Sequence, residues 1–323
     1  MKTIHWAMIG TGDVTEKKSG PGFYKAKNSV LYCVTTRTLA KAEDYAKRHH
    51  VEKVFASVDD LLADPKVDAV YIATPPGSHK DYALRCAEAG KVCYIEKPIA
   101  LTYNEALEIS EAFKKANVKA FVAYYRRTLP RFTEVKVLLD AGTIGDVRFV
   151  NVAYYRPAAK DEINGTHWHV QPEISGGGIF MDMAVHTLDI LDFFFGAIEK
   201  VAAFSVNQAG YYAPEDNVAL SFAFDNHVTG TGNWCFTTDT VADNIQIVGS
   251  KGEINFGCFT NDPIQLKTAE QETAIPAGTI EHVHQNLIQT IVDELNGQGS
   301  CPSTIESALR TAWVCDQVYQ QQD

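Results

Sequence analysis

Two hydrophobic patterns follow one another along the chain. In residues 1–123, short runs of apolar residues alternate with longer amphipathic stretches. Such alternation is typical of a parallel sheet with right-handed helical crossovers. A helix that starts at Asp13 should form two short pieces, because Gly20-Pro21-Gly22 interrupts it. The predicted strands are 4–9, 30–35, 69–73, 92–95 and 120–123, and the further helices are 39–49, 79–89 and 102–116. We expect a doubly wound Rossmann domain over residues 1–123.

Beyond residue 123 the apolar runs are longer and β-rich, and turns at 225–227 and 249–252 predict hairpins. A mostly antiparallel open sheet should result, with one face covered by helices and the other face left open. The predicted strands are 147–155, 201–206, 218–224, 228–236, 244–248 and 253–256, and the helices are 131–140, 179–195, 281–296 and 304–320. Residues 124–323 are therefore expected to form a second, α/β domain.

Net charge, hydrophobicity and cysteine spacing disfavour several classes of function. The 323 residues carry a net charge of −11, and no basic run offsets it, which disfavours nucleic acid and anionic membranes as partners. No apolar stretch reaches the roughly 18 residues of a membrane span, and Met1 leads straight into the first strand. A cytoplasmic protein is expected. The seven cysteines show neither disulfide nor CxxC metal spacing and are expected to be reduced.

The first predicted strand runs directly into Gly10-Thr11-Gly12, and a helix is expected to open at Asp13 and Val14. Two glycines between a strand and a helix permit the close approach of backbone to a pyrophosphate. The third glycine of that fingerprint is replaced by Thr15, so an ordinary strand–turn–helix is the alternative.

Glu96-Lys97-Pro98 follows the strand at 92–95 and should lie at the carboxyl edge of the sheet, where open α/β sheets bind ligands. A solvated lysine at a strand end is the alternative reading. Two other turns should reach the same edge: Thr36-Arg37 after the second strand, and the segment with Thr74, Pro75 and His79. We expect these residues, with Glu96 and Lys97, to contribute to a dinucleotide site.

The turn after the second strand bears on the choice of cofactor. No Asp or Glu occurs from 30 to 42, where an NAD-preferring fold places an acidic residue for the ribose hydroxyls. Thr36, Arg37 and Lys41 instead offer a hydroxyl and two cations to a 2′-phosphate. NADP is favoured on this basis. NAD is the alternative, with Arg37 merely stacked on adenine.

Asp182 and His186 are four residues apart on the helix predicted at 179–195, and therefore share one face. Gly176-Gly177-Gly178 before them would let the helix start close to a ligand. The alternative is an ordinary helix N-terminus with a satisfied histidine. Removal of a hydride from a carbinol carbon needs a group to take the hydroxyl proton, and histidine suits that role. Lys97 would stabilise developing charge on the same oxygen, while Asp182 orients the imidazole or bonds the hydroxyl.

Two histidine pairs, His167/His169 and His282/His284, have a spacing that could chelate a metal in an extended segment. No metal is predicted, because no cysteine or carboxylate set completes either pair. Trp168 is instead a candidate aromatic wall for a sugar ring, with His169 near the cofactor. Tyr155 is a second candidate wall, with a core or interface position as the alternative.

The order and spacing of these motifs over nearly the whole chain resemble the glucose–fructose oxidoreductase, inositol dehydrogenase and rhizopine-catabolism family. The resemblance implies an NAD(P)-dependent oxidoreductase acting on a sugar, polyol or related alcohol or ketone. It also implies catalytic roles for Lys97, Asp182 and His186, substrate binding by the second domain, and a homodimer or homotetramer formed through the open sheet face. An NAD-dependent glycosidase and a non-catalytic sensor of the same fold are the alternatives. Substrate identity and reaction direction do not follow from the sequence.

Overall fold

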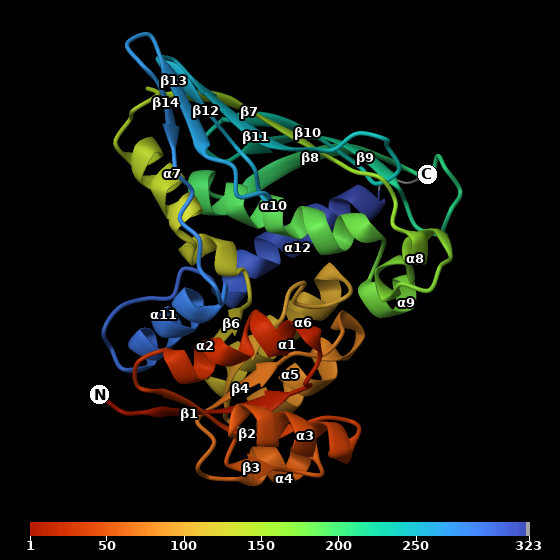
Figure 1. Ribbon diagram of the computed structural model, residues 1–323, viewed down its shortest axis with the longest axis vertical. Coiled ribbons are helices and arrows are strands. Elements are labelled where there is room, and N and C mark those ends of the chain that lie inside the picture. Colours follow the sequence, from red (N-terminus) through yellow and green to blue (C-terminus); the bar gives the residue numbers. More distant parts are fainter. Residues whose placement is uncertain (321–323) are drawn as a thin grey trace. The chain divides into compact units, whose positions relative to one another are not determined.

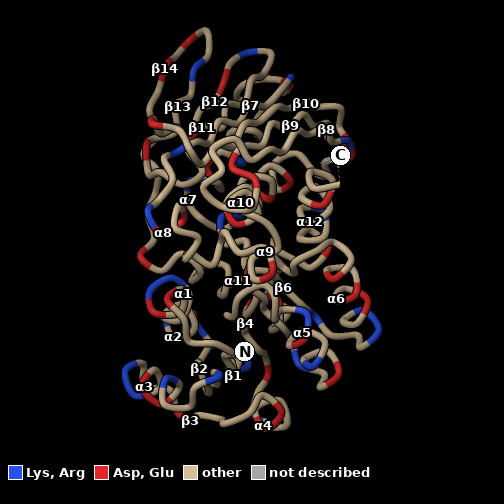
Figure 2. Tube along the Cα trace, turned by 90° about the vertical axis from the view of Figure 1, so that its right-hand side faces the viewer, with Lys and Arg blue, Asp and Glu red and all other residues tan. Residues whose placement is uncertain are grey.

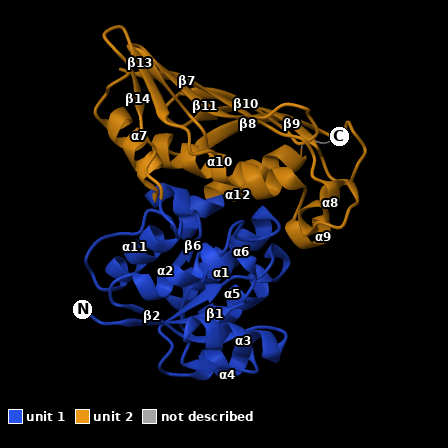
Figure 3. Cartoon of the chain, in the orientation of Figure 1, with its two compact units in different colours: residues 1–128, 280–309 blue, residues 129–279, 310–323 orange. Residues whose placement is uncertain are grey.

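The computed structural model describes residues 1–320, and the chain forms two compact units. Unit 1 comprises Met1–Thr128 and Ile280–Leu309, and unit 2 comprises Leu129–Thr279 and the segment from Arg310 onward (Figure 3). The predicted boundary near residue 123 differs from this division, because unit 1 also contains residues 280–309. The chain returns to unit 1 because the helix after residue 280 buries its apolar face there.

Unit 1 is built on a six-stranded parallel sheet with the order β3-β2-β1-β4-β5-β6 (Figure 1). This is the strand order of a dinucleotide-binding Rossmann domain. The short strand β3 was not predicted. The strands are β1 (Ile4–Ile9), β2 (Ser29–Thr35), β3 (Lys53–Val54), β4 (Ala69–Ile72), β5 (Val92–Ile95) and β6 (Ala120–Val122).

The helices of unit 1 agree with most of the predicted ranges, including the break at Gly20. Two differences stand out: α4 was not predicted, and α11 begins later than residue 281. The helices are α1 (Asp13–Lys17), α2 (Gly20–Lys25), α3 (Leu39–His49), α4 (Val58–Ala63), α5 (His79–Glu88), α6 (Tyr103–Ala116) and α11 (Gln285–Leu295), with the 3-10 turns η1 (Pro76–Ser78) and η2 (Tyr125–Thr128).

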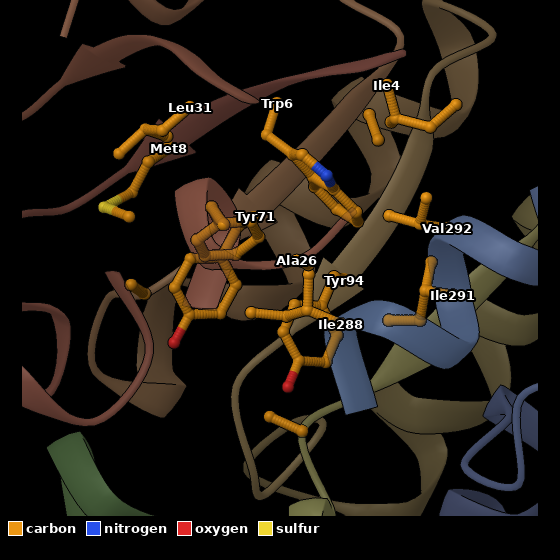
Figure 4. Packing of buried hydrophobic residues seen from close by; sticks show 14 of the residues in the cluster. Ile4, Trp6, Met8, Ala26, Leu31, Tyr71, Tyr94, Ile288, Ile291 and Val292 are labelled. Atoms are coloured by element: carbon orange, nitrogen blue, oxygen red, sulfur yellow. The ribbon is translucent and has the colours of Figure 1, made fainter. Parts of the chain in front are cut away.

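Aromatic rings fill the core beneath the sheet of unit 1 (Figure 4). Trp6 of β1 packs against Phe23 of α2, with ring centroids 5.0 Å apart. Tyr71 and Tyr94 of the neighbouring strands stack at 5.0 Å. Ile288 of α11 lies in the same cluster, so the returning segment completes this core.

The missing third glycine of the fingerprint has a local explanation. Thr15 is fully buried, and its carbonyl accepts a hydrogen bond from Tyr45 of α3 at 3.0 Å. A Cβ added at Gly20 would lie 2.1 Å from that carbonyl oxygen. The close approach of helix to core, which the third glycine permits in the fingerprint, occurs here at Gly20.

Unit 2 is built on an eight-stranded sheet with the order β14-β13-β12-β11-β7-β10-β9-β8. All neighbouring pairs are antiparallel except β10 and β7. Both predicted hairpins are present, whereas β13 and β14 were not predicted. The strands are β7 (Val147–Tyr155), β8 (Ile198–Val206), β9 (Asn217–Phe224), β10 (Thr229–Cys235), β11 (Ala242–Gly249), β12 (Gly252–Phe256), β13 (Ile264–Thr268) and β14 (Glu272–Ile275).

Helices cover one face of this sheet. Along β10, buried Gly230, Gly232 and Trp234 alternate with exposed residues, and Trp234 meets Phe180 of α10 edge-on at 5.4 Å. Alternate side chains of the strands therefore form an outer face without helices. The helices are α7 (Pro130–Asp140), α8 (Lys160–Ile163), α9 (Pro172–Ser175), α10 (Ile179–Phe195) and α12 (Ile305–Gln320, which begins in unit 1), with the 3-10 turn η3 (Trp168–Val170).

Neither charged side chains nor potential metal ligands form a dominant cluster in the part of the chain that the structure describes. Figure 2 shows acidic and basic residues interspersed along α3, α5 and α6. Within residues 1–320 no group of three His, Cys, Asp or Glu side chains is arranged to hold a metal ion. No helix in that range is both long and apolar enough to cross a bilayer.

Candidate active site

The carboxyl edge of the unit 1 sheet gathers the predicted cofactor residues. Gly10 follows β1, Thr36 follows β2, Thr74 follows β4 and Glu96 follows β5. The strand order reverses between β1 and β4, and open α/β sheets bind ligands at such a switch point. Residues that are far apart in sequence thus share one sheet edge.

The glycine turn has the properties that a phosphate-binding loop needs. Gly10 has a φ of +97°, and a Cβ there would lie 2.8 Å from the carbonyl oxygen of Ala73. At Gly12, the N-cap of α1, a Cβ would meet nothing within 4 Å, so its outer side is open. Thr11, Asp13 and Val14 complete the turn. These residues fit the pyrophosphate of a dinucleotide.

The turn after β2 presents accessible cations. Thr36 is half-buried, whereas Arg37 and Lys41 are exposed at the start of α3. The structure therefore places the three residues of the predicted 2′-phosphate site on one short turn and the first turn of one helix.

His79 joins two of the edge loops. Its ring is fully buried, with Nδ1 2.9 Å from the carbonyl oxygen of Pro98 and Nε2 2.8 Å from that of Thr74. Burial lowers the pKa of His79, while the two carbonyl contacts act in the opposite direction. Pro75 beside it is exposed. His79 thus ties the loop after β4 to the loop after β5, and we assign it to support of the cofactor turn.

Glu96 and Lys97 differ in their surroundings. The Lys97 side chain is half-buried, and the Lys97–Pro98 peptide bond is cis. The Glu96 side chain is buried, and its carboxylate accepts hydrogen bonds from the Tyr71 hydroxyl and, at 3.3 Å, from the Lys97 backbone N–H. Both oxygens are engaged inside unit 1, which argues against the predicted direct contact of Glu96 with the cofactor.

In unit 2, the glycine run before α10 serves internal packing. A Cβ at Gly177 would lie 2.4 Å from the Tyr319 hydroxyl, and one at Gly178 would lie 2.8 Å from Glu215 Oε1. Glu215 is buried and accepts hydrogen bonds from the Gly178 N–H at 3.1 Å and from Tyr319 at 2.8 Å. The space that the sequence suggested for a ligand is occupied by these side chains, which fix the start of α10.

Asp182 lies in the first turn of α10, one helical turn before His186. Asp182 Oδ2 is 3.5 Å from Nε2 of His169, so η3 contributes an imidazole to the same helix face. Trp168, the predicted sugar wall, is 38% exposed and stands 3.7 Å from the His169 ring, centroid to centroid. The structure therefore groups His169, Trp168 and Asp182.

His186 is buried beside an aromatic pair that the sequence did not reveal. Phe259, which follows β12, meets the His186 ring at 6.1 Å and Tyr154 of β7 at 4.6 Å. Successive residues of a strand point to opposite faces. Tyr155 therefore lies on the outer face of the sheet, and its predicted contact with substrate is not supported by this placement.

The second histidine pair belongs to the interior of unit 1. His282 Nδ1 lies 2.7 Å from the Lys17 carbonyl oxygen, and His284 Nδ1 lies 2.9 Å from the Tyr94 hydroxyl. Burial, with the charges of Lys18, Lys97 and Arg126, lowers the pKa of His284 to about 3. Both histidines are engaged in contacts within unit 1.

The comparisons with known proteins agree with this geometry. Residues 4–124 match the model of an oxidoreductase family with an NAD-binding Rossmann fold, and residues 132–255 match the C-terminal domain of the same family. These matches define the class of the protein, an NAD(P)-dependent oxidoreductase. The chain belongs to the glucose–fructose oxidoreductase, inositol dehydrogenase and MocA family.

Relatives cover most of the chain. An oxidoreductase of Formosa agariphila is 37% identical over 320 residues, which span 97% of each protein. The scyllo-inositol 2-dehydrogenase (NAD(+)) of Bacillus subtilis is 29% identical over 83% of this chain and 78% of its own. The structure of aldose-aldose oxidoreductase from Caulobacter crescentus superposes with a TM-score of 0.89 at 20% identity, covering 99% of this chain and 97% of its own, and shows the shared fold.

The buried His284 predicts a specific pH dependence of stability. Its pKa is about 3 in the folded protein, against an ordinary value of 6.5, so between these values the unfolded chain binds the extra proton. This group therefore favours unfolding increasingly as pH falls below 6.5, at up to about 1.4 kcal/mol per pH unit. Urea unfolding at several pH values from 7.5 to 4.5 should show a shallower acid loss for His284→Gln than for wild type. Equal slopes in wild type and in His284→Gln would contradict the prediction.

Proposed function

We propose that this protein transfers a hydride between a nicotinamide cofactor and a carbinol or carbonyl carbon of a sugar or polyol. The observation that carries the proposal is the placement of Lys97 after β5, at the ligand-binding edge of the Rossmann sheet. Relatives support the substrate class, because they include scyllo-inositol 2-dehydrogenase and the 1,5-anhydro-D-fructose reductase of Ensifer adhaerens. A levoglucosan dehydrogenase in complex with NADH shares the fold, with a TM-score of 0.84.

Three side chains supply the charge and proton chemistry in this proposal. The bound nicotinamide supplies or accepts the hydride. His186 takes the hydroxyl proton during oxidation and returns it during reduction, since an imidazole exchanges protons near neutral pH. Lys97 donates a hydrogen bond to the same oxygen and stabilises the negative charge that develops there. Asp182 bonds the substrate hydroxyl or orients His186, and its carboxylate lies 3.5 Å from His169 Nε2.

Trp168 is the proposed wall for the substrate ring. Its indole is accessible, and it belongs to the η3 turn that brings His169 to Asp182. A flat aromatic face buries the apolar C–H side of a sugar while the hydroxyls remain free to bond polar groups. Phe259 packs against the His186 ring and is itself backed by Tyr154, so an aromatic pair shields part of this imidazole.

Substitution of Lys97 tests the catalytic assignment. The assay follows NAD(P)H absorbance with scyllo-inositol, 1,5-anhydro-D-fructose and levoglucosan, the compounds named for relatives. Lys97→Met should lower turnover by roughly 100-fold or more, the scale of losing one electrophilic donor, without changing the melting temperature appreciably. His186→Ala should flatten the pH profile of turnover. Near-normal turnover by Lys97→Met would show that the assignment is wrong.

NADP(H) is the proposed cofactor in preference to NAD(H). Support comes from the exposed Arg37 and Lys41 beside Thr36, and from the absence of any acidic residue from 30 to 42. A guanidinium matches the geometry of a phosphate, and a charge-assisted hydrogen bond contributes about 1.5–3 kcal/mol.

The cofactor preference is measurable without a substrate. Dissociation constants for NADPH and NADH from fluorescence titration should differ by roughly 10-fold or more in wild type. Arg37→Ala should weaken NADPH binding and leave NADH binding within a factor of about two, whereas Lys47→Ala, which removes an exposed cation in the last turn of α3, should change neither. Equal affinities in wild type, or tighter NADH, would overturn the proposal.

We further propose that two copies pair through the outer face of the unit 2 sheet. Phe204 of β8 is 79% exposed, and Ala202, two residues before it on the same strand, lines a hollow of about 560 Å³. Small side chains line much of the hollow, among them Ala202, Ser221, Ala223 and Thr231. An isologous dimer would place Phe204 of each protomer against the other sheet.

A cytoplasmic location stays a prediction from the sequence.

Replacement of Phe204 tests the pairing. Sedimentation velocity should show a dimer or tetramer for wild type and a dissociation constant raised at least 10-fold for Phe204→Glu, because a buried carboxylate would face an apolar surface. Val137→Glu is the matched control, since Val137 is 60% exposed on α7, which packs on the helix-covered side. A monomeric wild type would contradict the proposal.

A further inference from the structure

A buried polar network lies directly beneath the Glu96-Lys97 turn. Tyr71 of β4 and Tyr94 of β5 stack side by side, and Figure 4 shows both hydroxyl groups at the same end of the pair. The Tyr71 hydroxyl donates to Glu96 Oε1, and the Tyr94 hydroxyl meets His284 Nδ1 at 2.9 Å. His284 Nε2 lies 3.7 Å from Glu96 Oε1. Two tyrosines, one glutamate and one histidine therefore form a closed group.

This group contains two ionisable side chains that are almost wholly removed from solvent. The side chain of His284 is 0% exposed and that of Glu96 is 9% exposed. Among residues 1–320, His284 Nε2 has no hydrogen-bond partner, and its nearest acidic atom is the Glu96 oxygen. Buried polar groups are costly unless they are paired. Packing alone could be achieved by apolar side chains, so a structural role is expected of these polar groups at the Glu96-Lys97 turn.

The geometry of Glu96 indicates that role. One carboxylate oxygen accepts from Tyr71, and the other accepts from the Lys97 backbone N–H at 3.3 Å. The Glu96 N–H in turn donates to the Ile72 carbonyl oxygen at 3.0 Å, continuing the β4–β5 pairing. The backbone that carries the Lys97 side chain is thus held from both sides at the end of β5.

His284 completes the group from a distant part of the sequence. It is the N-cap of α11, and its own N–H donates to the Lys18 carbonyl oxygen at 3.3 Å. Its ring packs against Tyr125 at 4.6 Å. The imidazole thus lies against the Glu96 carboxylate in the interior of unit 1.

We propose that Glu96 is a positioning residue for Lys97, held in place by Tyr71 and by His284 of the returning segment. Glu96 does not touch the cofactor in this assignment. It fixes the backbone from which the Lys97 ammonium reaches the reacting oxygen, so the consequence for turnover rests on the function proposed for Lys97.

Glu96→Gln isolates the role of the second oxygen. Tyr71 and the Lys97 N–H donate to different oxygens of Glu96. Glutamine has the same size, but an NH2 group replaces one of those oxygens, so one of the two donors faces a group that cannot accept. With lysine-selective nitrogen labelling, the Lys97 amide should exchange with solvent about 10-fold faster than in wild type, the scale of one lost hydrogen bond. Tyr71→Phe in the Glu96→Gln background removes the competing donor and should restore slow exchange.

Turnover gives the second readout. Glu96→Gln should lower kcat about 10-fold and leave KM for NADPH within a factor of about two, because cofactor contacts are unchanged. Burial raises the pKa of Glu96, so the acid limb of the kcat profile should contain a group that the glutamine variant lacks. The assay uses whichever of scyllo-inositol, 1,5-anhydro-D-fructose and levoglucosan wild type turns over.

Histidine variants test the returning segment. His284→Asn keeps an acceptor for Tyr94 but removes the atom that faces Glu96, and should speed Lys97 exchange. His282→Gln, a matched change two residues away, should leave it at the wild-type rate. Wild-type Lys97 exchange in Glu96→Gln would overturn the proposal, and equal exchange in the two histidine variants would remove His284 from it. Full activity of Lys97→Met would instead refute the catalytic role of Lys97 and leave the exchange result standing.

Discussion

Parallel pairing of β1 with β2 on one side and β4 on the other is the constraint on which unit 1 depends. Parallel pairing places the carboxyl ends of β1, β2, β4 and β5 at one edge of the sheet. Residues 10, 36, 74 and 96 therefore share that edge, although they are spread over the first hundred positions. A parallel sheet must be covered on both faces. The aromatic cluster around Trp6 and Phe23 covers one of these faces, and α11 is part of it. Core packing and site assembly in this unit are therefore consequences of one strand order.

The two units use the same device to hold a turn. In each, a buried glutamate accepts one hydrogen bond from a tyrosine hydroxyl and one from a backbone N–H. Glu96 joins Tyr71 to the N–H of Lys97, and Glu215 joins Tyr319 to the N–H of Gly178. Burial raises the pKa of both carboxyl groups. The hydrogen bonds that these carboxyl groups accept act in the opposite direction. Such bonds are stronger in a low-dielectric interior than in water, which suits places where the backbone position must be kept.

The sequence predicted most strands and helices well, because hydrophobic periodicity and glycine turns are local signals. It therefore located β1, β2, β4 and β5, the helix that carries Asp182 and His186, and both hairpins of unit 2. It could not reveal β3 and β14, which are short strands at the edges of their sheets and are stabilised by their neighbours. Contacts such as Phe259 with His186, or His284 with Tyr94, join residues far apart in the chain and leave no local pattern. The face on which a tyrosine lies was equally hidden: a single step along β7 separates Tyr154 from Tyr155.

The return of residues 280–309 to unit 1 makes the nucleotide-binding half of this protein discontinuous in the gene. Leu287, Ile288, Ile291 and Val292 are fully buried in a core whose other members were translated some two hundred residues earlier. A chain emerging from the ribosome cannot finish its first unit until the second has been synthesised. Recombination that exchanges the N-terminal half alone would likewise separate the sheet from part of its own interior. The two units are distinct in space but must be inherited together.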